Sequence, residues 1–132
     1  MQEASTAAVG RFLIAILFIM SGLSKITTPA AIIGYIDSAG LPFPTLGYVI
    51  TLAVEIGGGL LLLTGFQARI AAGIMAVFTI AAALAFHRNF ADQNQMIHFM
   101  KNIAITGGLL QVVAFGAGRF SLDARRTPHL QN

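Results

Sequence analysis

The chain contains no cysteine among its 132 residues. This absence excludes disulfide bonds, thiolate catalysis, iron–sulfur ligation and zinc sites built from cysteine. Charged residues are also scarce: they make up 10% of the chain, whereas 56% is hydrophobic and the mean hydropathy is +0.78. A chain with so little polar surface cannot cover a water-soluble globule. Its expected solvent is therefore lipid.

Long polar tracts and low-complexity segments are lacking as well. We therefore expect a single domain over residues 1–126, followed by a short polar tail over 127–132. The net charge is +3, but the eight lysines and arginines are scattered among apolar segments and form no stripe, so nucleic acid is not an expected partner. A haem-attachment motif and a dinucleotide-binding fingerprint are also absent. The chain by itself therefore has nothing that could carry electrons.

Four apolar runs are present, at residues 7–26, 46–66, 68–87 and 97–115. Each is close to the roughly 20 residues that cross a bilayer core. The first run lacks the features of a cleaved signal peptide, because no cation precedes Arg11, no clear cleavage site follows, and Lys25 lies near its end. Backbone amides in hydrocarbon need partners within their own segment, and these runs are too uniformly apolar for barrel strands. The predicted fold is all-α, an integral membrane bundle of four antiparallel transmembrane helices.

The connections between the runs support this organisation. The first connection, "TTPAAIIGYIDSAGLPFPT", holds three of the four prolines, which disfavour one continuous helix, although residues 30–38 suit a short interfacial helix. Gly65 in "GFQAR" suits a helix C-terminus, so the second and third helices should be antiparallel neighbours. The polar C-terminal segment "GRFSLDARRTPHLQN" is expected to fray.

The positive charges predict the orientation in the membrane. One side carries five cations and the other carries three: Arg11, Arg69, Arg119, Arg125 and Arg126 against Lys25, Arg88 and Lys101. Because cytoplasmic loops are richer in lysine and arginine, both termini should be cytoplasmic.

One carboxylate lies within an apolar run. Glu55, in "AVEIGGGLLLL", is roughly 13 Å along the second helix at 1.5 Å per residue. Lys101 is about one turn into the fourth helix, shares a face with two neighbouring polar residues, and has a stem long enough to extend toward Glu55. Charged residues within spans usually face the bundle interior and one another. The predicted polar cluster is Glu55 with Lys101 and Lys25, bordered by His87, His98 and Asn102.

Each of these residues also has a purely structural interpretation. A glutamate–lysine pair can simply fix the rotation of two helices, and Arg11 is expected to extend to the membrane surface. The two histidines lie at the interface, where histidine is ordinary. No metal is expected, because a set of Glu55, His87, His98 and Asp92 lacks a compact ligand spacing such as H-E-x-x-H.

The glycines at bilayer depth predict close helix packing. No strand or Walker pattern precedes them, so they are not phosphate-binding loops. Small residues lie four apart in the second and fourth runs, which allows backbones to approach in lipid. We therefore expect these two helices to be close neighbours, with Gly57, Gly58 and Gly108 as packing residues and with Gln111 and Ser21 adding interhelical hydrogen bonds.

Six segments occur in a fixed order: "FIMSGLSKITTPA", "YIDSAGLPFP", "AVEIGGGLLLLTGFQAR", "FH", "HFMKNIAITGGLLQ" and "FSLDARR". This set, over about residues 9–126, resembles the DoxX family of small bacterial inner-membrane proteins. The resemblance implies four transmembrane helices and, by family naming, a role associated with oxidoreductases. Some relatives are subunits of a thiosulfate:quinone oxidoreductase, and mycobacterial relatives are linked with enzymes of sulfur and oxidative-stress chemistry. The family pattern falls on Ser21, Gly22, Lys25, Glu55, Lys101 and Asn102.

Two functional classes follow. As a membrane subunit of a quinone-linked redox system, related to sulfur or oxidative stress, the protein would bind a quinone and need a soluble or membrane redox partner. As a non-enzymatic membrane protein, it would anchor a partner or carry a small acid or a proton through the same cluster. Beyond the lipid bilayer, the partners considered are such a redox protein and a second copy of the chain.

Overall fold

A computed structural model describes residues 2–126 and confirms the all-helical architecture. The described part of the chain has no strand. The elements, in chain order, are α1 (Gln2–Ile26), α2 (Pro29–Ser38), α3 (Pro44–Leu52), η1 (Ala53–Gly58), α4 (Gly59–Thr64), α5 (Ala68–Phe86), α6 (Gln93–Phe115) and α7 (Leu122–Arg126).

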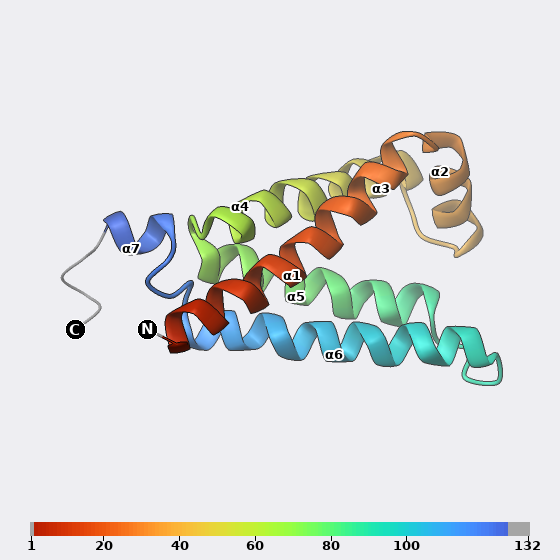
Figure 1. Cartoon of the computed structure of the whole chain (residues 1–132). Coiled ribbons are helices and arrows are strands. Elements are labelled where there is room, and N and C mark those ends of the chain that lie inside the picture. The colour runs from red at the N-terminus through yellow and green to blue at the C-terminus, as the bar shows by residue number, and fades with distance from the viewer. Residues whose placement is uncertain (1, 127–132) are drawn as a thin grey trace.

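Four helical segments are long and apolar enough to cross a membrane: Gln2–Ile26, Pro44–Thr64, Ala68–Phe86 and Gln93–Phe115. The second span is built from α3, η1 and α4 in succession. Consecutive spans run in opposite directions, and α1 begins at the same end of the bundle at which α6 ends (Figure 1). The short helix α2 lies at the opposite end and confirms the helix predicted after the first proline.

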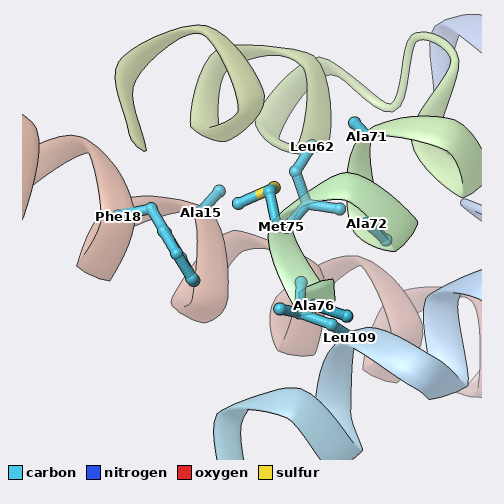
Figure 2. Packing of buried hydrophobic residues seen from close by; sticks show 8 residues of the cluster. All are labelled: Ala15, Phe18, Leu62, Ala71, Ala72, Met75, Ala76 and Leu109. Carbon is cyan, nitrogen blue, oxygen red and sulfur yellow. The ribbon is translucent and has the colours of Figure 1, made fainter. Parts of the chain in front are cut away.

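The core is formed by alanines and a few large apolar residues of α1, α4, α5 and α6. Met75 of α5 is fully buried and points toward Ala15 and Leu62, on α1 and α4 (Figure 2). Ala72 and Leu109 extend this cluster toward α6. Many large apolar side chains elsewhere are exposed, as a bundle that is surrounded by lipid requires.

The predicted proximity of the second and fourth helices is wrong. In the described structure, α6 packs chiefly on α5, whereas η1 and α4 pack on α1. A methyl group at Gly57 would meet nothing within 4 Å, so this glycine is not a packing residue. Gly58 instead allows the approach of Met75 from α5, and Gly108 that of Ile14 from α1.

The closest helix approach joins α1 to the second span. A methyl group at Gly22 would lie 2.5 Å from Ile56, and one at Gly59 would lie 3.3 Å from the carbonyl oxygen of Ala15. These two glycines face each other's helices and bring the backbones together. Gly59 of the second run therefore packs against the first helix, whereas Gly58 packs against α5.

The turn between the second and third spans confirms the predicted role of Gly65. Its φ is 71°, and its N–H donates to Leu62 O at 3.2 Å while that of Phe66 donates to Leu61 O at 3.0 Å. This pair of hydrogen bonds is a Schellman motif, and the left-handed residue that it needs is most often glycine.

The segment after α6 is ordered as far as Arg126, contrary to the prediction that it frays. The Asp123 carboxylate accepts from the N–H groups of Gln67 at 2.7 Å and Ala68 at 2.9 Å, which caps α5 and fixes α7 in place. The part of the predicted tail at 127–132 lies outside the described residues.

Arg11 also differs from the prediction. Its side chain does not extend to the membrane surface: it is buried, and its guanidinium donates to Ala117 O at 3.1 Å and Phe120 O at 2.6 Å. A buried charge is stable only when it is hydrogen-bonded, and backbone carbonyls of the segment that follows α6 provide those acceptors here. Arg11 therefore anchors this segment to α1.

Candidate functional site

The intramembrane carboxylate is paired with Lys25. The Lys25 ammonium lies 3.0 Å from both carboxylate oxygens of Glu55 and donates to the Ser21 hydroxyl at 2.7 Å. Ser21 in turn donates to Glu55 Oε1 at 3.3 Å. Glu55 is only 6% exposed, and an unpaired carboxylate would be costly in the bundle interior. The hydrogen bonds to Lys25 and Ser21 compensate this cost.

Local backbone structure aims Glu55 at α1. Residues Ala53–Gly58 form a π-helical segment between two α-helical ones. A π-turn adds one residue to the helical repeat and changes the face on which the following side chains lie, and such segments are frequent at functional sites. Gly22 opposite Ile56 leaves the room that this wider turn needs.

Tyr48 stabilises the α1 end of the pair. Its hydroxyl donates to the carbonyl oxygen of Lys25 at 2.9 Å. This carbonyl is one of the last in α1, and it also accepts from the N–H of Thr28 at 3.3 Å. The hydrogen bond links α3 to α1 next to the lysine, and it holds the Lys25 backbone in position.

A cavity of about 490 Å³ adjoins the ion pair. All six residues of the predicted cluster line it: Lys25, Glu55, His87, His98, Lys101 and Asn102. The rest of its walls is mostly apolar, with Phe18, Phe78 and Ile105 among them. Cavities of this size with a few converging polar groups are typical of small-molecule sites.

The histidines line the cavity at the end of the bundle where α5 ends and α6 begins. The ring centroids of His87 and His98 are 5.1 Å apart. Partial burial lowers the pKa of His87, and the neighbouring His98 lowers it further. The neutral form of His87 is therefore favoured.

The aromatic residues beside the histidines join α2 to α5. Tyr35 stacks on Phe86 with ring centroids 5.0 Å apart, and both residues line the cavity. The helix α2 therefore covers part of the cavity with its apolar face, to which the buried Ile36 belongs.

Lys101 lies on the cavity but does not pair with Glu55. Glu55 forms its salt bridge with Lys25. The reason is that α6 lies behind α5 and not beside the second span. Asn102 donates to the carbonyl oxygen of Thr79 at 3.4 Å, and the Thr79 hydroxyl donates to Met75 O at 2.6 Å.

The structure adds residues that sequence reasoning did not assign to the site. Thr79 and Tyr35 line the cavity, and Gly22 provides the close approach beside the ion pair. Thr79 occurs in an apolar stretch without any motif, whereas Tyr35 begins the segment "YIDSAGLPFP". Only the packing of their helices places both residues here. The sequence could have indicated Gly22 and Ser21 as site residues, since they lie one turn before Lys25 on the same helix.

Metal binding receives no support from this geometry. Residues 2–126 contain no group of three or more histidine, aspartate or glutamate side chains placed to hold a metal ion. Asp92 caps α6 instead, by accepting from the N–H of Asn94 at 2.9 Å.

The DoxX family model matches residues 6–88, which include most of α1, the ion pair and α5. The chain belongs to the DoxX family. It is 44% identical over 115 residues to the inner membrane protein YqjF of Escherichia coli, a match that covers 87% of each chain. It is also 30% identical over 122 residues to the inner membrane protein YphA of the same organism, which covers 89% of this chain and 87% of the relative.

No solved structure shows a significant match to the chain. The family match, the two relatives and the four spans together make this chain a DoxX-type inner membrane protein.

Proposed function

We propose that this DoxX protein is a quinone-binding membrane subunit of a redox system. The observation that carries the proposal is the cavity of about 490 Å³, which joins apolar walls to an ion pair and two histidines within the membrane-spanning bundle. A quinone has an apolar ring and tail and two carbonyl oxygens that accept hydrogen bonds. The cavity offers matching surfaces to both parts.

The cationic groups of the cavity suit the carbonyl oxygens. Lys25 and Lys101 are donors only, and Lys25 is held in position by Glu55 and Ser21. His87 and His98 lie at the end of the cavity where α5 ends and α6 begins, and imidazole is a side chain that can accept and donate a proton. A bound quinone would accept two electrons and two protons, and these side chains would orient it and supply the protons. The electrons must come from a partner protein, because the chain has no cysteine and no haem-attachment motif.

The test is to purify the protein in mild detergent, extract lipophilic ligands and identify them by mass spectrometry. Quinone should co-purify with the wild type, and Lys101→Met with His98→Gln should reduce the amount recovered. Arg88→Gln is a matched control, since it removes an exposed cation at the same end that does not line the cavity. Equal quinone recovery from all variants, or none from the wild type, would refute the proposal.

A second candidate rests on the charge of the cavity. Two lysines and one glutamate line it, which leaves an excess positive charge that suits a small organic acid. In this case the protein carries an acid and needs no redox partner. Uptake of a labelled carboxylic acid into proteoliposomes, in the absence of quinone, separates this function from the first.

A further inference from the structure

A second cavity, of about 640 Å³, lies at the opposite end of the bundle from α2. It is a groove between the first half of α1 and the second half of α6, which meet only lightly because each packs mainly on another helix. Ala7 and Gly10 form one wall, and Val112 and Phe115 form the other. Ala7, Gly10 and Phe115 are exposed, so the groove faces the surrounding lipid.

Polar groups gather at the mouth of this groove. The exposed Arg119 and the buried Arg11 line it with Glu3, which leaves an excess of one positive charge. Arg11 holds the segment 117–120 through two backbone carbonyls and thereby fixes the position of Arg119. This cationic site is therefore ordered by the fold.

Gln111 lies deeper in the groove. It is four residues before the end of α6, or roughly 6 Å along the helix axis, and its exposed amide has no hydrogen-bond partner among the described residues. An amide that faces lipid is unfavourable unless it finds a partner there. The ester carbonyl groups of a phospholipid lie at this depth, just below the headgroups.

We propose that the groove binds one anionic phospholipid from the leaflet at this end of the bundle. Its phosphate contacts Arg119, an ester carbonyl accepts a hydrogen bond from Gln111, and one acyl chain lies along Gly10, Ile14 and Gly108. Basic pockets between transmembrane helices are typical sites for anionic headgroups. The apolar length of the groove distinguishes a lipid from a soluble anion, which would use the cationic mouth alone.

The test is native mass spectrometry of the protein released from detergent micelles, with bound lipids counted. Phosphatidylglycerol should bind one to one and more tightly than phosphatidylcholine with the same acyl chains. Arg119→Gln should weaken phosphatidylglycerol binding about fivefold, since a cation at the membrane surface contributes about that factor. Equal binding of the two lipids would overturn the proposal.

A matched pair of glycine variants tests the groove itself. A methyl group at Gly10 or at Gly107 would meet nothing within 4 Å, so both substitutions by leucine should fold, but only Gly10 lines the groove. Gly10→Leu should abolish the bound lipid and Gly107→Leu should retain it. Displacement of the lipid by glycerol 3-phosphate would show a site for a soluble anion. A change of oligomeric state in Gly10→Leu with unchanged lipid binding would show an interface between copies. Either result would overturn the proposal.

Discussion

Glu55 remains compatible with the bundle interior because Lys25 and Ser21 lie within hydrogen-bond distance of it. Glu55→Gln should leave the Lys25 ammonium without its counter-charge. We expect the free energy of unfolding to fall by an amount on the order of 2–3 kcal/mol. This is at or below the low end for a broken buried ion pair, because the Lys25 side chain is 24% exposed.

The double variant Glu55→Gln with Lys25→Met should recover much of this loss, and thermal unfolding in detergent measures it. Lys101→Met is the control, since Lys101 makes no ion pair with Glu55, and its effect should add to that of Glu55→Gln within about 0.5 kcal/mol. Coupling of Glu55 to Lys101 as strong as that to Lys25 would contradict the observed pairing.

His87 makes stability depend on pH. Its pKa is lowered by burial and by His98, so the unfolded chain binds more protons between this lowered pKa and the ordinary value of 6.5. Stability should therefore rise with pH through this window and fall as the pH drops below about 6.5. The melting temperature of His87→Gln should change less between pH 7.5 and pH 5.5 than that of the wild type. Identical pH profiles would show that His87 makes no contribution.

At the scale of the elements, the sequence predicts the four spans because length and hydropathy alone decide whether a helix crosses a bilayer. It cannot decide which lysine reaches Glu55, because both lysines lie at suitable depth and the choice depends on which helices are neighbours. The π-segment Ala53–Gly58 could not be predicted from the sequence either, since a change from α to π hydrogen bonding has no compositional signature. The prediction that Arg11 extends to the membrane surface is wrong for a related reason: the acceptors of its guanidinium are carbonyl groups more than 100 residues away in sequence.

The glycines of the second span offer a test at the same scale. Gly59→Leu should destabilise the bundle by about 1–3 kcal/mol, because the new side chain would press on the α1 backbone at Ala15 and Ile19. Gly57→Leu should be nearly neutral, since a methyl group there meets nothing. Detergent melting curves measure both. A Gly57 variant as unstable as the Gly59 variant would contradict the open surroundings of Gly57 and would mean that this face of the second span packs on another helix.

For the whole molecule, the remaining question is which end of the bundle faces the cytoplasm. The end at which α1 begins and α6 ends carries five arginines: Arg11, Arg69, Arg119, Arg125 and Arg126. Arg11 is buried and bound to backbone carbonyls, so it counts less as a loop charge, but four cations remain against Lys25, Arg88 and Lys101. Two of these three line the cavity, which leaves Arg88 as the exposed loop cation at that end.

This asymmetry predicts cytoplasmic termini under the positive-inside rule. A green fluorescent protein fused after residue 132 should therefore be fluorescent, and alkaline phosphatase fused there should be inactive, because it needs the oxidising periplasm. Phosphatase inserted after Phe90, in the exposed connection between α5 and α6, should be active and serves as the control. If the C-terminal phosphatase were active and the inserted one inactive, the bundle would have the opposite orientation. The cavity with Lys25 and Glu55 would then open toward the cytoplasm, where a quinone-linked partner would have to bind.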